Sequence, residues 1–290
     1  MSRIEILDRA DRSSARLRKI VFAAVTGALW AALHYGVAEH VLHRGIDRPL
    51  CVLVGDGGIL AAFAVMVFAA LGAFCGARLD QREGFPGMLA VAVALAVWAY
   101  PGGTMDDWLK NMNTAVRPPT AAAYAALIPE YICWAIIFAA SYFAAGGRLA
   151  KIRDGQTNPR DGLTALLVTV AVAAILIMLL SGPRISHTYH GQVYFSVAAS
   201  FILAVMAARR VSGVREPFWY LPAPVIVGLV GIGYAMAKPG LGVAFADINV
   251  IPANGLIRAL PIEMSAVGVA AILFSLRTLN RISSDVDQNA

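Results

Sequence analysis

The sequence predicts an all-α membrane protein, a polytopic bundle of about eight transmembrane helices. Hydrophobic residues make up 59% of the 290-residue chain and only 14% are charged, against about 25% in an average soluble protein. Long apolar segments also recur, each near the roughly 20 residues that a helix needs to cross the hydrocarbon. A soluble core could not cover this much apolar surface, so the lipid bilayer is the predicted partner of these segments.

Polar or turn-rich stretches separate the apolar segments from one another. The third and seventh segments are short and end at Pro-Gly pairs, Pro101-Gly102 and Pro239-Gly240. The eight predicted spans are 20–38, 56–77, 87–101, 121–145, 162–182, 190–208, 221–237 and 261–277.

The spans form one predicted transmembrane domain, residues 20–277, between a basic arm (1–19) and a tail (278–290). No small-residue cleavage site ends the first apolar run, so we expect an uncleaved first span. Most of the 24 Lys and Arg residues fall in the arm, the tail and alternate loops. The positive-inside rule then predicts a multi-pass protein of the cytoplasmic (plasma) membrane with both termini in the cytoplasm. Orientation accounts for the basic residues, so no nucleic-acid partner is predicted.

The two halves of this domain, 20–152 and 162–277, are compatible with a 4+4 parallel repeat. Helix four opens with Ile128-Pro-Glu130 and helix eight with Leu260-Pro-Ile-Glu263, each after a long outer loop. Some transporters are built from such repeats. Proline near a helix start and glycine near its end also favour any helix, so convergent punctuation is the alternative.

Four acids near predicted outer helix ends are candidate substrate-binding residues: Asp56, Glu130, Glu263 and Glu39. An ionisable side chain at membrane depth is by default a functional candidate. Asp56 also has the spacing of an N-cap, and Glu130 and Glu263 lie in first helical turns, where the helix dipole stabilises a carboxylate. Glu39 ends a helix, where the dipole disfavours an anion, so it requires another stabilising neighbour.

All five histidines fall on the predicted outer side, and four of them form two H-x-x-H pairs, His40–His43 and His187–His190. This spacing puts both rings of a pair on one helical face. Imidazole is a good ligand for Zn, Cu, Fe and Ni, so a transition-metal or haem site is one hypothesis for these four residues. Polar rings that simply lie at the headgroup level are the alternative, and no cofactor is otherwise predicted.

Three functions remain open at this stage. A small-solute or ion transporter with an extracytoplasmic polar mouth ranks first, because the two short spans end at matching positions. The alternatives are a membrane enzyme or metal-binding protein with an outer His/carboxylate site, and a structural or assembly subunit of a membrane complex. The Gly72-x-x-x-Gly76 motif permits close helix packing within the chain, in a homo-oligomer or with partner subunits. No P-loop or G-x-S-x-G motif occurs, and whether the protein is an enzyme stays open.

Overall fold

Every regular element in the described part of the chain is a helix. The computed structural model describes residues 19–38, 51–54, 58–79, 85–112, 121–146, 158–181, 189–238 and 254–289. Within these ranges there is no sheet. The all-α prediction is therefore confirmed.

In the described ranges, seven helices are long and apolar enough to cross a membrane: Lys19–Val37, Gly58–Arg78, Ala121–Ala144, Pro159–Leu180, His190–Ser212, Pro217–Ala237 and Pro261–Asn280. Their elements are η1 (Ala32–Ala38) at the end of the first helix, α2 (Gly58–Leu79), α5 (Ala121–Ala125), α6 (Ile128–Ala144), α7 (Pro159–Leu180), α8 (His190–Ser212), η3 (Pro217–Trp219), α9 (Ala223–Ala237) and α10 (Pro261–Asn289). The remaining helices are α3 (Phe85–Ala99), α4 (Met105–Met112) and η5 (Gly255–Ile257). By the length and composition of these helices, the chain is a multi-pass membrane protein.

Two elements differ from the predicted spans. The third span, 87–101, corresponds to α3, whose 15 residues rise only about 22 Å, less than the roughly 30 Å of the hydrocarbon. The turn at Pro101-Gly102 ends this helix early. In contrast, α10 continues past residue 277 to Asn289, through the segment predicted as a tail. No proline or glycine follows Gly268 in that helix to end it.

Local sequence signals account for helix ends in the second half of the bundle. The side chain of Asn158 accepts a hydrogen bond of 3.1 Å from the N–H of Arg160, and Pro159 takes the first position of α7. This pairing of an asparagine cap with a following proline favours a helix start. At the C-terminal end of α8, Gly213 adopts φ +70°, a left-handed conformation that glycine takes without strain.

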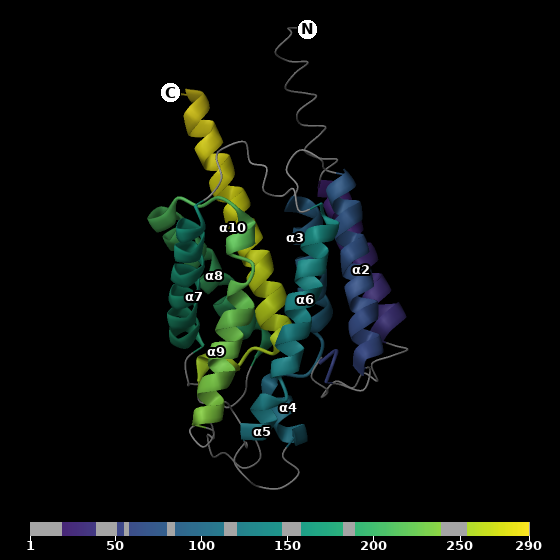
Figure 1. Ribbon diagram of the computed structural model, residues 1–290. Helices are drawn as coiled ribbons and strands as arrows, with labels where there is room; N and C mark the ends of the chain where they lie inside the picture. The colour runs from purple at the N-terminus through teal and green to yellow at the C-terminus, as the bar shows by residue number, and fades with distance from the viewer. Residues whose placement is uncertain are drawn as a thin grey trace.

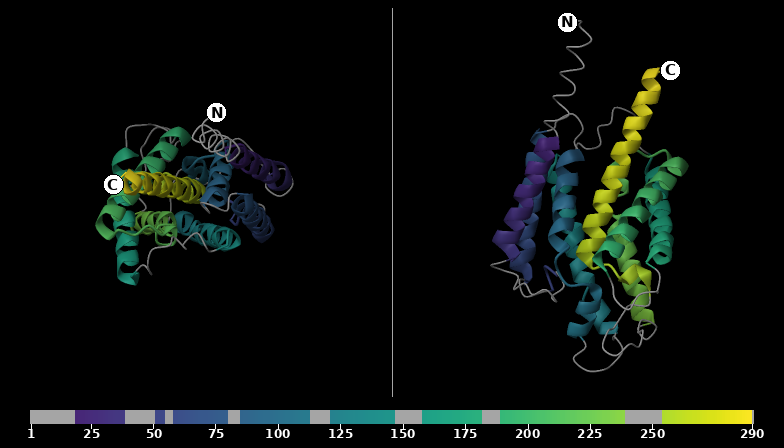
Figure 2. Two further views of the ribbon diagram at one scale, coloured as in Figure 1. Left: turned by 90° about the horizontal axis from the view of Figure 1, so that it is seen from above. Right: turned by 180° about the vertical axis from the view of Figure 1, so that it is seen from behind.

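The core of the bundle is built around α10, which contacts α3, α6, α8 and α9. Seen from above, this yellow helix lies between the blue helices of the first half and the green helices of the second (Figure 2). Within its spanning window 72% of residues are buried, against 22% in α2 and in α7. The outer helices α2 and α7 therefore offer apolar faces to lipid. In Figure 1, α4 and α5 lie at the end of the bundle opposite the C terminus.

Glycines let α2 approach its neighbours closely. A Cβ atom added to Gly76 would lie 2.4 Å from the Cα of Gly87 on α3, and one added to Gly72 would lie 3.2 Å from Leu29 of the first helix. The Gly72-x-x-x-Gly76 motif thus serves packing within the chain, as small residues do between membrane helices.

We expect Gly76→Ala to destabilise the protein by about 1–3 kcal/mol, the usual cost of overpacking a tight contact. The added methyl group meets backbone atoms of Gly87, which cannot move aside as a flexible side chain would. Thermal unfolding in detergent measures the effect. The control is Gly191→Ala on α8, where an added Cβ meets no atom within 4 Å. Equal melting temperatures for both variants would contradict the close α2–α3 contact.

Candidate functional site

The carboxylate of Glu130 is fully buried and accepts four hydrogen bonds. Its Oε1 accepts from the N–H of Val52 (2.7 Å) and from Nε1 of Trp134 (3.0 Å). Its Oε2 accepts from the N–H groups of Leu53 (2.8 Å) and Val54 (3.2 Å). All four partners are donors, so no proton on Glu130 is needed to satisfy its oxygens. Glu130 thus ties the 51–54 segment to the first turn of α6.

A second buried carboxylate, Glu263, lies in the first turn of α10. Its Oε2 accepts a hydrogen bond of 2.8 Å from the N–H of Leu260, the residue before the helix. This is the backbone contact that the acid of a capping box makes. Its Oε1 lies 2.6 Å from Nδ1 of His190, the first residue of α8. Glu263 therefore caps its own helix and also joins α10 to α8.

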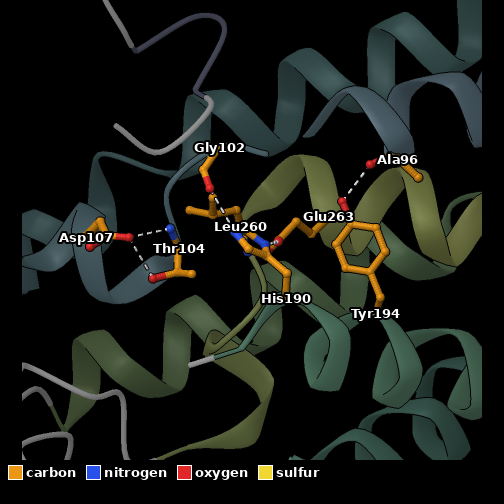
Figure 3. Close-up of polar contacts among 8 residues, drawn as sticks. All are labelled: Ala96, Gly102, Thr104, Asp107, His190, Tyr194, Leu260 and Glu263. Atoms are coloured by element: carbon orange, nitrogen blue, oxygen red, sulfur yellow. Dashed lines mark hydrogen bonds and ion pairs between the residues drawn. The ribbon is translucent and has the colours of Figure 1, made fainter. Parts of the chain in front are cut away.

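His190 bridges Glu263 and the turn that follows α3. Its Nε2 lies 2.8 Å from the carbonyl oxygen of Gly102, so the imidazole stands between Gly102 and Glu263 (Figure 3). A carbonyl oxygen can only accept, so Nε2 carries a proton. A hydrogen bond at the other side then requires one further proton, held by Nδ1 or by the carboxylate. The observed geometry therefore belongs to a pair that shares a proton.

Two tyrosines enclose the imidazole of His190. Their ring centroids lie 5.6 Å (Tyr100) and 6.3 Å (Tyr194) from it. The hydroxyl of Tyr194 donates to the carbonyl of Ala96 at 2.6 Å, which ties α8 to α3. The side chain of His190 is 17% exposed and that of Glu263 is 2% exposed. His190 is thus the more exposed partner of the pair.

A capping interaction at the start of α4 fixes the turn that carries Gly102. The Oδ2 of Asp107 accepts from the N–H (2.7 Å) and the hydroxyl (3.0 Å) of Thr104. The turn therefore positions the Gly102 carbonyl against His190.

Cys51 lies near both buried carboxylates. Burial raises the pKa of the Cys51 thiol well above its usual value, and the charges of Glu130 and Glu263 add to the rise. The thiol is therefore neutral and unsuited to nucleophilic chemistry.

A second ionisable group outside the spans is Arg258. Burial lowers the pKa of its guanidinium, and the nearby Asp106 carboxylate opposes this change.

Three of the predicted site residues fall in the described part of the chain: Glu130, Glu263 and His190. Glu263 and His190 are in direct contact. Glu130 is not part of this contact: it has its own hydrogen-bond donors, and Cys51 lies near both carboxylates. Both ring nitrogens of His190 are engaged by Glu263 and Gly102. In the described residues, no group of three or more His, Cys, Asp or Glu side chains could hold a metal ion.

The other predicted site residues, namely Asp56, Glu39, His40, His43 and His187, lie outside the described residues. Gly102, Tyr100 and Tyr194 were not among the predicted site residues. The Pro101-Gly102 pair was the available signal for Gly102, because the carbonyls that end a helix lack partners within it.

Comparison with family models, with curated proteins and with solved structures finds no match to this chain. Its fold and hydropathy define the class, a multi-pass helical membrane protein. Any more specific function must be inferred from the site itself.

Proposed function

We propose that this protein is a proton-coupled transporter of a small solute, with the His190–Glu263 pair as its proton-binding site. The observation that carries the proposal is the part-buried pair that shares one proton, held at the junction of α8, α10 and the end of α3. Ionisable groups in membrane spans are costly and form proton relays in pumps and transporters.

The pair couples a proton to the arrangement of helices. With the shared proton present, His190 links α10 to the turn after α3. Without it, the lone pair of Nδ1 faces a carboxylate at 2.6 Å, which is repulsive, so the contact breaks. A proton that stabilises one arrangement over another shifts the population between them. Coupling of this kind is what an alternating-access transporter requires.

We further propose eight spans in a 4+4 arrangement, in which the short helix α3 is the third span although it rises only about 22 Å. Glu130 and Glu263 each occupy the third position of their helices. The contact of α2 with α6 has a counterpart in that of α8 with α10, and the contact of α3 with α10 has one in that of α6 with α9. A parallel repeat would pair these contacts in the same way, so they support it.

In this arrangement both termini lie in the cytoplasm and the His190–Glu263 pair lies near the outer face. The distribution of basic residues supports this orientation. Glu263 binds the proton, and Glu130 holds the 51–54 segment beside it. Asp56 and Glu39 remain predicted contributors to the polar mouth.

Solute-driven proton flux tests the proposal. The protein is reconstituted into liposomes that contain the pH-sensitive dye pyranine, and amino acids, sugars, divalent cations and quaternary amines are added in turn. We expect one of these classes to move protons through the wild type. Glu263→Gln should abolish that flux because the amide cannot exchange a proton, whereas His34→Gln in η1, outside the pair, should retain it.

Two outcomes would contradict the proposal: no solute that moves protons through the wild type, or undiminished flux through Glu263→Gln. The function as an assembly subunit of a membrane complex would then be favoured. The packed core and the apolar lateral faces of the protein are compatible with that function, which requires no solute pathway.

A further inference from the structure

A long apolar groove runs along one side of the bundle, beside the His190–Glu263 pair. It has a volume of about 590 Å³, within the roughly 300–1,000 Å³ typical of small-molecule sites. Residues of the first helix, α3, α8 and α10 line it. Its lining residues include Leu89, Val97, Tyr100, Tyr194, Ala198 and Phe274.

The groove has the dimensions and chemistry of a hydrocarbon chain. It follows the chain from Leu89 on α3 to Tyr100, the residue after this helix, which is about 16 Å at the helical rise. Among the described residues that line it, the polar side chains are Tyr100 and Tyr194, both at the end next to His190. An occupant that matches it is apolar along its length and polar at one end.

The groove opens on the lateral face of the bundle, which faces the lipid bilayer. Lining residues from two helices are half exposed, with Val97 at 51% and Phe274 at 55%. The first helix, α8 and α10 all qualify as membrane spans, and the surrounding solvent of such segments is lipid. A bilayer lipid can therefore enter without crossing water.

We propose that this groove binds one acyl chain of a membrane phospholipid, with the headgroup at the Tyr100 end. Tyr100 is 52% exposed, and tyrosine is enriched at the interface because it has an apolar body and a polar tip. Its hydroxyl can donate to a phosphate oxygen. The head of the bound lipid then lies beside the Tyr100 ring that packs on His190.

A second crevice between helices of the bundle is much smaller than this groove. Between α6 and α9 the gap has a volume of about 140 Å³. The rings of Tyr142, Phe143 and Phe218 line it, and the Tyr142 ring packs against each of the other two. The protein thus fills one boundary with its own side chains and leaves the other open.

Photocrosslinking in the wild type locates the lipid directly. The protein is reconstituted with a phosphatidylcholine that carries a diazirine midway along one acyl chain, and adducts are mapped by peptide mass spectrometry. We expect adducts concentrated on α3 residues 89–97 and α10 residues 267–274. Adducts spread evenly over all exposed helices, α7 included, would mean annular lipid only and overturn the proposal. Adducts absent from the groove would mean that another segment or a second copy covers it, and would also overturn it.

A groove-filling variant measures the affinity. Ala198→Trp places an indole in the groove, and the matched control Ala199→Trp changes the next residue of α8, which is not among the groove residues. The loss of even two buried methylene contacts weakens binding about tenfold. Native mass spectrometry should therefore find one retained phospholipid per chain in the wild type and in Ala199→Trp, and about tenfold less in Ala198→Trp. Equal retention in the two variants would overturn the proposal, and this result does not depend on whether transport is detected.

Discussion

Glu130→Ala should cost several kcal/mol of stability, the largest effect that we expect from a single substitution in the described chain. The change leaves three backbone N–H groups of the 51–54 segment and the indole N–H of Trp134 without their acceptor. Each buried donor left unsatisfied costs about 1–3 kcal/mol, and water cannot easily replace a fully buried carboxylate. Size-exclusion chromatography after stepwise heating in detergent measures the loss of folded protein.

Glu130→Gln separates the charge from the volume of this side chain. The amide retains one acceptor oxygen but directs its own N–H₂ group at two donors, so we expect a clear loss of stability that is smaller than that of alanine. The matched control is Glu216→Gln in the loop before η3, where the carboxylate caps no backbone N–H. If Glu130→Gln melted at the wild-type temperature, the four hydrogen bonds would not be the anchor described here.

His190→Ala should be the second most damaging change, with a cost of about 3–5 kcal/mol. Removal of one partner of such a pair leaves the other charge uncompensated, and here Glu263 would keep the Leu260 N–H as its partner among the described residues. The contact of His190 with the Gly102 carbonyl would also be lost, although the Tyr194 hydroxyl would still tie α8 to α3. Thermal unfolding in detergent is again the measurement, with His34→Ala as the control.

The double variant His190→Ala/Glu263→Gln tests whether the damage comes from the unpaired carboxylate. Because glutamine carries no charge, the double variant should be more stable than His190→Ala alone. A strongly alkaline buffer should also destabilise the wild type by removing the shared proton, and should affect the double variant less. A double variant that loses the sum of both single effects would show that the two residues are not coupled.

The sequence by itself determined the class of the protein and most of its helices. Apolar segments of membrane-spanning length can be recognised directly in the sequence. Lipid offers the backbone no hydrogen-bond partners, so such a segment forms a helix, in which its N–H and C=O groups bond to one another. Seven of the eight predicted spans correspond to the seven long apolar helices. The short third span was also marked, since Pro101-Gly102 cannot continue a helix. The first-turn positions of Glu130 and Glu263 followed from the prolines beside them.

Only the tertiary structure decided what those acids contact. Glu130 and the Val52 N–H are 78 residues apart, and His190 and Glu263 are 73 residues apart, and no local pattern relates segments at such distances. From sequence, the helix dipole and hydrogen-bond capping account equally well for an acid in the first turn of either helix. In the structure, however, Glu130 accepts hydrogen bonds from the 51–54 segment and Glu263 contacts His190. Hydropathy records how apolar a helix is but not which neighbour it packs against. For that reason, the proton-sharing pair and the groove beside it emerge only when α3, α8 and α10 are brought together.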